Sequence, residues 1–246
     1  MFMDNGLITI QKASRMLGVA EQTMRRWDES GRLIAVRGKN NYRYYKKEDI
    51  EEYAKNNLKD IFKSVKNWVL SGTGVEPRPD FYCKDSAVFQ ARLTRLKDEL
   101  SKIKNLKDTY FLITSIAGEI GDNSFAHNFG NWPDIMGIFF AYDLKKKKIV
   151  LADRGQGMLK TLRKVKPELN NDIDALRTGF TEVISGRSPE SRGNGLKYVR
   201  EMVISNEIRL FFQTGEAELK IQKGDLNLNI KKSSTKFHGC LALIQF

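Results

Sequence analysis

The chain has 246 residues, of which 41% are hydrophobic and 29% charged, and its 42 Lys and Arg against 30 Asp and Glu give a formal net charge of +12. This composition is typical of a globular protein with one large or two modest domains. It contains no apolar run near the ~20 residues that a membrane helix needs and no signal-peptide pattern, so we expect a cytoplasmic protein without a membrane segment. Its two cysteines, Cys83 and Cys240, argue against a disulfide framework or a cysteine-based zinc site.

The basic excess is spread along the chain. Residues 1–60 carry a net charge of +3, residues 61–150 carry +4 and residues 151–246 carry +5. A positive charge distributed in this way favours weak attraction to nucleic acid or other acidic surfaces, and it does not indicate a fold.

Residues 1–60 have the pattern of a small domain with three helices and a hairpin. Apolar residues from Ile10 to Leu17 follow helical spacing, Gly18 interrupts them, and a second helix follows up to Gly31. Two short helices joined by a glycine turn predict a helix-turn-helix unit. Residues 34–45 then predict a hairpin around "GKNN", and "KEDIEEYAKNN" predicts a third helix with an acidic first turn.

The residues "LGVAEQTMRRWDESGRL", followed by Arg37 and "YRYYKKEDI", resemble the DNA-binding domain of MerR-like and excisionase-like proteins, over about the first quarter of the chain. The resemblance implies that the second helix enters the major groove of double-stranded DNA and that the hairpin, or wing, touches phosphates. It assigns DNA contacts to Thr23, Arg25 and Arg26 in the helix and to Arg37, Lys39, Arg43 and Tyr44 in the wing. Residues 10–45 hold eight Lys/Arg against three Asp/Glu, which supports this assignment.

Two points stay open in this segment. The glycine that usually precedes the Tyr-Arg pair of the wing is Asn41 here, which leaves the geometry of the turn undecided. A winged helix that binds only protein is the alternative, with Arg25 and Arg26 as a solvated face. Basic and aromatic residues recur in the wing as well as in the helix, and we therefore favour DNA.

The next segment predicts a linker and then an amphipathic helix. Residues 61–85 are expected to be the linker, because "LSGTGVEPRPDFYCKD" holds two glycines and two of the five prolines. Three-to-four spacing then places Val88, Leu93, Leu96, Leu100 and Ile103 on one side of a helix. We expect this helix to pack on the second domain. Pairing with a second copy, in a homodimer suited to two DNA half-sites, is the alternative.

The stretch "EIGDNSFAHN", residues 119–128, gathers polar side chains on a predicted helix. Glu119, Asn123 and His127 are four residues apart and lie on one strip of it. By themselves these residues fit a hydrated face or a metal site, although one histidine is few for zinc. The sequence leaves the role of Asp122 open.

Two glycine-rich segments follow. A hairpin of strands around residues 139–142 and 149–152 ends in "DRGQG", where a carboxylate at the end of a strand precedes glycines that allow the backbone to approach a ligand. The segment "SRGNGL" opens a helix whose first amides suit phosphate. Strands are predicted over residues 207–215, 217–224, 226–232 and 238–246.

In this order and spacing, "EIGDNSFAHN", "DRGQGM" and "RGNGL" resemble the N-box and the two glycine boxes of the GHKL (histidine-kinase-like) ATPases, over about the last 140 residues. The resemblance implies an α/β sandwich over residues 86–246, with a mixed sheet covered by helices on one face. The whole chain is therefore expected to be an α+β protein, with a winged helix-turn-helix over residues 1–60. The implied cofactors are ATP and Mg²⁺.

The resemblance also assigns roles to individual residues. Asn123 would hold Mg²⁺ through the phosphates, Glu119 would be the general base that orients water, and Asp153 would accept from the adenine amino group. The other residues that it assigns to the nucleotide are His127, Gly155, Gly157, Arg192, Gly193, Gly195 and Leu196. Residues 158–192 would form the nucleotide lid, with Arg187 reaching toward the phosphates.

The chain departs from the family at the last strand, where Gly239-Cys240 replaces the usual Gly-Thr, so the hydroxyl contact is expected to be lost. The two motif sets together predict an ATP-responsive DNA-binding protein. A serine protein kinase like the anti-sigma-factor kinases, acting on a protein partner, is one alternative, because Glu119 fits it equally. An ATP-binding switch without turnover is another.

Overall fold

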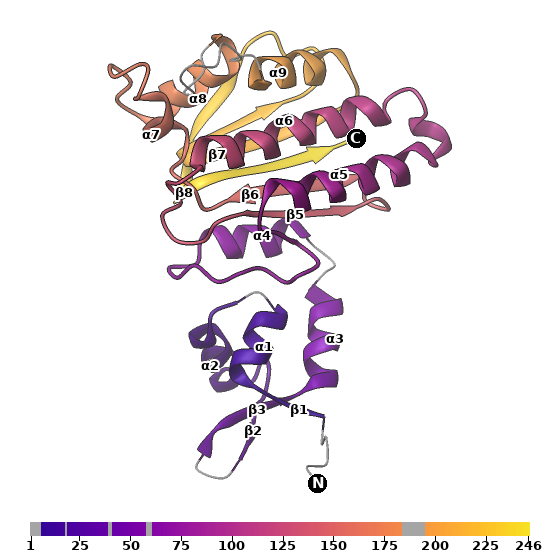
Figure 1. The fold of residues 1–246 in the computed structure, drawn as a ribbon, viewed down its shortest axis with the longest axis vertical. Helices are drawn as coiled ribbons and strands as arrows, with labels where there is room; N and C mark the ends of the chain where they lie inside the picture. Colours follow the sequence, from indigo (N-terminus) through magenta and orange to yellow (C-terminus); the bar gives the residue numbers. More distant parts are fainter. Residues whose placement is uncertain (1–5, 18, 39–40, 58–60, 184–194) are drawn as a thin grey trace.

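The computed structural model describes residues 6–17, 19–38, 41–57, 61–183 and 195–246. They form two lobes stacked along the long axis of the molecule, with the helix-turn-helix lobe at the N-terminal end and a sheet with helices at the other (Figure 1). Within those ranges no helix is long and apolar enough to cross a membrane.

The N-terminal lobe contains the predicted helices and wing. Its elements are β1 (Leu7–Thr9), α1 (Ile10–Leu17), α2 (Glu21–Glu29), β2 (Val36–Arg37), β3 (Arg43–Lys46) and α3 (Lys47–Asn57). The three strands form an antiparallel sheet in the order β1-β3-β2. Met24 and Tyr45 are fully buried in the core of the lobe, and the Tyr45 hydroxyl donates to the Met24 carbonyl over 3.1 Å. This bond fixes the wing to α2.

The wing keeps its turn without the usual glycine. Asn41 has a φ of +61°, in the left-handed region. Asparagine tolerates this region better than other non-glycine residues. The Asn41 amide donates to the Gly38 carbonyl over 3.1 Å, and the Gly38 amide donates to the Tyr42 carbonyl over 3.0 Å. Asn41 therefore takes the left-handed conformation that the usual glycine would favour.

The C-terminal lobe is built on a five-stranded sheet in the order β4-β5-β6-β8-β7. Its strands are β4 (Tyr82–Cys83), β5 (Ile138–Asp143), β6 (Lys148–Asp153), β7 (Arg209–Ile221) and β8 (Asn229–Gln245). Every neighbouring pair is antiparallel, so this sheet is antiparallel and not mixed as we expected. The reason is that β5–β6 and β7–β8 are joined as hairpins, which can only pair antiparallel.

Four predicted strands near the C-terminus merge into two. The expected break around residue 216 is a bulge inside β7, because Gly215 has a φ of +53° and shifts the register with β8. A bulge bends a strand without ending it. The strands expected over residues 226–232 and 238–246 are likewise parts of the continuous β8.

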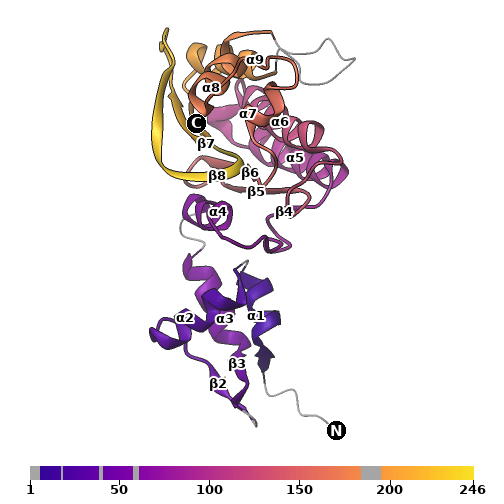
Figure 2. The ribbon, with the colours of Figure 1, turned by 90° about the vertical axis from the view of Figure 1, so that its left-hand side faces the viewer.

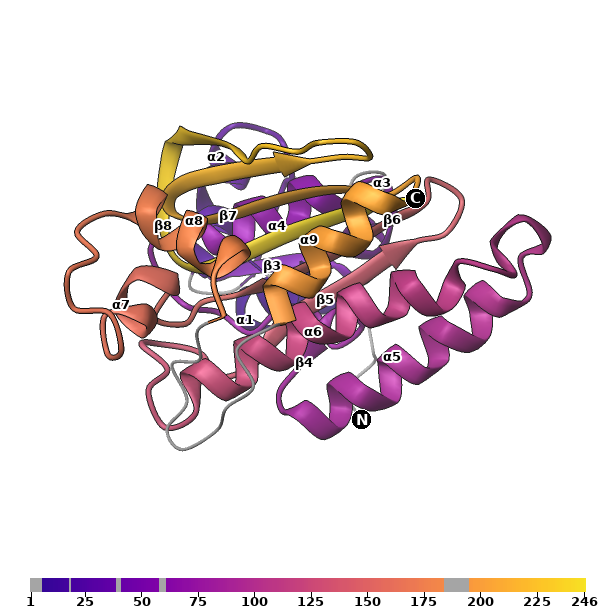
Figure 3. The same ribbon diagram turned by 90° about the horizontal axis from the view of Figure 1, so that it is seen from above.

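One face of the sheet is covered by α5 (Ser86–Ser101), α6 (Tyr110–Asn128) and α9 (Gly195–Ser205), which run side by side across it (Figure 3). The 3-10 helix η2 (Lys104–Leu106) follows α5, and α7 (Met158–Leu162) and α8 (Asp172–Thr181) lie beyond the end of β6. The side chain of Phe89 on α5 lies against Gly121 of α6, where an added Cβ would come within 2.2 Å of its ring. The amphipathic helix α5 thus packs on its own domain, as we favoured.

The second face of the sheet is covered by a helix in a segment that was expected to be a linker. Residues 61–85, expected to be a linker, contain α4 (Ile61–Val69) and the edge strand β4. Along β5, Phe139 and Ala141 face α4, whereas Ile138 and Phe140 face α6, as alternation along a strand requires. Helices therefore cover both faces and not one, and α4 lies between the sheet and the N-terminal lobe (Figure 2).

Candidate functional site

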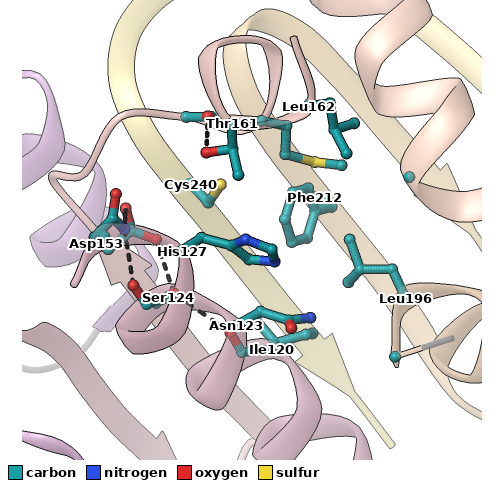
Figure 4. Close-up of a pocket in the computed structure, with 15 residues that line it drawn as sticks. Ile120, Asn123, Ser124, His127, Asp153, Thr161, Leu162, Leu196, Phe212 and Cys240 are labelled. Carbon is teal, nitrogen blue, oxygen red and sulfur yellow. Dashed lines mark hydrogen bonds between the residues drawn. The ribbon is translucent and has the colours of Figure 1, made fainter. Parts of the chain in front are cut away.

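A pocket opens in the C-terminal lobe where the second half of α6, the loop after β6 and the start of α9 meet (Figure 4). It encloses about 770 Å³ of empty space, part of which is open to solvent. Its lining consists of Ile120, Asn123, Ser124, His127, Asn128, Asp153, Gly157, Met158, Thr161, Leu162, Gly179, Gly195, Leu196, Phe212 and Cys240. The pocket therefore has an apolar wall and polar groups at both ends.

One polar end is the carboxylate of Asp153, the last residue of β6. Asp153 is 1% exposed and receives hydrogen bonds from neutral groups, among them Asn128 Nδ2 at 3.4 Å. Ser124 Oγ donates to its Oδ2 over 2.7 Å, and the Gly155 amide donates to its Oδ1 over 2.8 Å. Burial raises the pKa of Asp153 to about 6, despite these donors. Because each carboxylate oxygen can accept more than one hydrogen bond, Asp153 can still accept from a ligand N–H.

Asn128 holds the glycine loop against α6. Its Oδ1 accepts from the Gln156 amide over 2.7 Å, and its Nδ2 donates to the Ser124 carbonyl over 2.8 Å. A Cβ on Gly155 would lie 2.0 Å from Asn128 Nδ2, so no larger residue fits there. Gly157 has a φ of +75°, which also favours glycine. Both predicted glycines therefore bring backbone close to the pocket wall.

The hydroxyl that the last strand lacks is supplied by the neighbouring strand. Thr214 of β7 pairs with Cys240 in register and is fully buried. Its Oγ1 accepts from the Met158 amide over 3.1 Å and donates to the Gly239 carbonyl over 3.1 Å. Cys240 itself lines the pocket, and burial together with the nearby Asp153 raises the pKa of its thiol well above the usual value. Thr214 thus anchors the loop, and Cys240 presents a neutral thiol to a ligand.

The other polar end joins α6 to α9. A Cβ on Gly195 would lie 2.6 Å from Glu119 Oε2 and 3.3 Å from Asn123 Nδ2, so the start of α9 lies directly against both side chains. The first amides of a helix lack intrahelical partners and carry partial positive charge. His127 lies one turn further along α6 and points into the pocket between its two ends (Figure 4).

Some predicted residues lie elsewhere. Lys39, Arg187, Arg192 and Gly193 fall outside the described residues. Asp122 is exposed and accepts from Gln90 Nε2 over 2.7 Å, so it faces α5 and not the pocket. Much of the expected lid is packed into the core: Phe180 of α8 is fully buried, with its ring 5.3 Å from that of Phe212.

Among the residues that the sequence did not assign to the site, Ser124 and Asn128 line the pocket and Thr214 anchors the glycine loop beside it. Ser124 and Asn128 lie four residues apart in the same decapeptide, so their spacing carried a usable signal. No local sequence signal pointed to Thr214, because its position beside the glycine loop depends on the pairing of β7 with β8. Among the described residues no three His, Cys, Asp or Glu side chains cluster as a metal site.

The predicted DNA-binding residues of α2 are accessible. Arg25 and Arg26 are exposed and Thr23 is partly exposed. Arg25 pairs loosely with Glu21 over 3.5 Å, one turn earlier on the same helix. Such an exposed pair is weak, so both guanidinium groups can reach a phosphate or a base.

The predicted arginines of the wing are engaged with α2. Arg37 and Arg43 both donate to Asp28 Oδ2, over 2.6 and 2.7 Å, and the Ala35 amide donates to Asp28 Oδ1 over 2.9 Å. Burial would raise the pKa of Asp28, but these donors outweigh it and lower the pKa. Tyr44 lies over Gly38 in the same hairpin. The arginines therefore brace the wing, and Arg37 keeps 42% of its side chain exposed.

An exposed aromatic residue of the wing was not among the predicted contacts. Tyr42 is 66% exposed and adjoins the turn. Its signal was present in the sequence, since it lies between the turn residue Asn41 and the paired residue Arg43. It is a further candidate for contact with DNA.

Comparison with known proteins identifies the N-terminal lobe. A family model described as a helix-turn-helix domain matches residues 7–58, which confirms that prediction. The type II methyltransferase M.Eco47II of Escherichia coli is 39% identical over 57 residues, or 23% of this chain and 13% of the methyltransferase. Among solved structures, the ATPase region of Saccharomyces cerevisiae topoisomerase II aligns with a TM-score of 0.36 and 12% identity, over 55% of this chain and 37% of that one. The chain thus spans a minor part of both proteins, and a TM-score below 0.5 does not assign a fold.

Proposed function

We propose that this chain is a DNA-binding regulator whose C-terminal lobe binds ATP with Mg²⁺ in the manner of the GHKL ATPases, and that ATP controls the affinity of the helix-turn-helix lobe for DNA. One observation carries the proposal: a pocket joins a buried carboxylate at one end to a helix N-terminus beside Asn123 at the other, and Glu119 lies against the same helix N-terminus. An adenine nucleotide has an amino group on its base, which can donate to the carboxylate, and phosphates at its other end, which the first amides of a helix can bind.

The Asp153 end is suited to adenine. With a pKa raised to about 6 by burial, Asp153 is mostly ionised at pH 7.5 and can accept from an exocyclic amino group. A base carbonyl at that position would face the carboxylate as a second acceptor and could not bond to it. The apolar wall of Ile120, Met158 and Phe212 offers a flat base a dry contact surface. The pocket should therefore favour adenine over guanine.

The α9 end is suited to phosphates. The first amides of α9 favour anions, and Arg192 and Gly193, which precede it, are proposed to contribute as the family resemblance implies. The residue that would hold Mg²⁺ is Asn123, through its amide oxygen. The ion, when bound, would neutralise phosphate charge and take its other ligands from phosphates and water.

Glu119 is proposed as the general base. It lies one helical turn before Asn123 and in contact with the start of α9, so its Oε2 can accept a proton from a hydroxyl group that attacks the terminal phosphate. The hydroxyl would belong to water in an ATPase. A serine protein kinase would use the same carboxylate on the hydroxyl of a partner.

Nucleotide binding and DNA binding can be tested on the same full-length protein. DNA affinity, measured by anisotropy on duplexes selected from a randomised library, should change by at least about fivefold between nucleotide-free protein and protein with Mg-ATP. Absence of ATP binding, or identical DNA affinities, would refute the proposal. Removal of Mg²⁺ by a chelator should weaken ATP binding.

Turnover separates the enzymatic forms of the proposal. Glu119→Gln should lower release of phosphate by about 100-fold or more, with ATP binding retained. Asp122→Asn is the matched control, because Asp122 is on the same helix but faces α5. Labelled ATP incubated with a cell extract should yield free phosphate for an ATPase, a labelled protein for a kinase, and neither for a switch without turnover.

A further inference from the structure

Arg154 is the largest fully buried side chain in the described part of the molecule, and the proposed function does not use it. It follows Asp153 directly, and the two side chains lie on opposite faces of the sheet: Asp153 lines the pocket, whereas Arg154 reaches α4. A fully buried arginine is rare unless its charge is paired and its donors are satisfied.

The guanidinium group of Arg154 binds the end of α4. Its Nη1 donates to the carbonyls of Trp68 and Val69, over 2.8 and 3.2 Å. These are the last residues of α4. The final carbonyls of a helix lack intrahelical donors and carry partial negative charge. Arg154, which follows the last residue of β6, therefore caps the C-terminal end of α4.

Two further elements hold Arg154 in place. Asp134, in the loop before β5, accepts from its Nε and Nη2 over 2.8 and 2.7 Å. Burial would raise the pKa of Asp134, but Arg154 outweighs it and lowers the pKa. His238 of β8 lies with Nδ1 2.9 Å from the Arg154 carbonyl. All three guanidinium nitrogens thus have fixed acceptors, so a movement of the backbone at residue 154 must move α4 or break these bonds.

The end of α4 also faces the helix-turn-helix lobe. Trp68 lines a crevice between the lobes together with Trp27, Arg32 and Tyr53 of the N-terminal lobe. The centroid of the Trp68 ring is also 5.9 Å from the ring centroid of Phe139 on β5 and 5.9 Å from the Arg154 guanidinium carbon. Trp27 belongs to α2, the helix that carries the predicted DNA-binding residues.

We infer that Arg154 is a positioning residue that couples the pocket to the DNA-binding lobe, through the end of α4 and Trp68. This inference rests on the proposed function and names the route of its regulation. A ligand bound to Asp153 favours one arrangement of the glycine loop. Because the protein interior is densely packed, a change in the glycine loop moves Arg154 and, through its hydrogen bonds, the end of α4. The ligand thereby shifts the population between two positions of the helix-turn-helix lobe relative to the C-terminal lobe.

The first test compares Arg154→Lys with wild type in the full chain. Lysine keeps the charge but cannot bind two carbonyls and a carboxylate at once. We expect ATP affinity within about threefold of wild type, and the ratio of DNA affinities with and without Mg-ATP to fall toward one. Arg95→Lys is the control, because Arg95 is exposed on α5 and pairs with Glu99 one turn later on the same helix. An unchanged ratio in folded Arg154→Lys protein overturns the inference. If this variant fails to fold, the double variant Arg154→Met, Asp134→Leu removes both charges together and takes its place.

The second test needs no change at Arg154. The chain has three tryptophans, so Trp27→Phe with Trp132→Phe leaves Trp68 as the only one. Its fluorescence should change when Mg-ATP binds, although Trp68 lies on the face of the sheet opposite the pocket. An emission spectrum that stays constant while ATP binding is saturated overturns the route. If the DNA affinity of the wild-type protein did not depend on Mg-ATP, the proposed function itself would be refuted. The two failures are therefore distinguishable.

Discussion

Two buried carboxylates, one in each lobe, are used in opposite ways. Asp28 in the N-terminal lobe is neutralised by Arg37 and Arg43, and its pKa is lowered. Asp153 in the C-terminal lobe receives hydrogen bonds from a hydroxyl and an amide, and burial raises its pKa. A carboxylate that is paired with arginines has its negative charge neutralised within the protein. A carboxylate that accepts only from neutral donors keeps its charge and can accept a further hydrogen bond from a ligand. Asp28 is therefore a structural acidic residue, whereas Asp153 is the one that we propose to bind a ligand.

The largest effect is expected at Asp153. Asp153→Ala should weaken ATP binding by about 100-fold, because hydrogen bonds to a charged acceptor contribute about 1.5–3 kcal/mol each. DNA affinity without nucleotide should stay as in wild type. Isothermal titration calorimetry and DNA anisotropy on the same preparation measure both. Tight ATP binding by the variant would contradict the role of Asp153.

The glycine loop beside Asp153 should be nearly as sensitive. Gly155→Ala places a Cβ 2.0 Å from Asn128 Nδ2 and must displace the side chain that holds the loop. ATP affinity should fall by about tenfold or more, as expected when a packed contact is lost. Gly72→Ala is the matched control, because its Cβ would meet no atom within 4 Å. Equal ATP affinities for the two variants would show that the loop does not touch the ligand.

Asp28 should show the reverse pattern. Asp28→Ala leaves Arg37 and Arg43 without their shared acceptor, which should destabilise the N-terminal lobe by about 1–2 kcal/mol. The wing should lose its fixed position, so DNA affinity falls while ATP affinity is retained. Urea unfolding and DNA anisotropy test the two effects. Unchanged DNA affinity in this variant would show that DNA binding does not require the Asp28 contacts to Arg37 and Arg43.

A smaller effect is expected from pH, and its sign differs between the two carboxylates. Asp153, with a pKa raised to about 6, gains a proton between pH 7 and pH 5, and ATP affinity should fall by up to about tenfold as its acceptor is lost. In the folded chain the raised pKa means that protonation through this window stabilises the fold relative to pH 7. Asp28, with a lowered pKa, keeps its stabilising charge there and loses it only below its ordinary value of 3.8.

The phosphates of ATP titrate in the same range, so the pH test requires a reference. Asp153→Asn cannot gain this proton, and the ratio of wild-type to variant affinity at each pH cancels the contribution of the phosphates. A ratio that is constant from pH 7.5 to 5 would contradict the shifted pKa of Asp153.

Local patterns in the sequence were enough to predict several elements. Helical spacing and a glycine turn predicted the helix-turn-helix, which the family match over residues 7–58 confirms. The resemblance of the polar decapeptide and the glycine segments to the GHKL motifs implied residues that the structure brings to one pocket, namely Asn123, His127, Asp153, Gly157, Gly195 and Leu196. Both kinds of signal depend on neighbours along the chain, and such neighbours remain neighbours in any fold.

Only the tertiary structure decided the contacts between distant segments. Apolar spacing in α4 was visible at Ile61, Val65 and Trp68. Its role as the cover of the second face depended on packing against β5, β6 and β8, which are far from α4 along the chain. The Thr214 hydroxyl reaches the glycine loop because of its register with β8. Arg154 caps α4 because the chain leaves β6 after Asp153 with the two side chains on opposite faces of the sheet. Strand register and the choice of sheet face are set by long-range packing, so no local pattern could supply them.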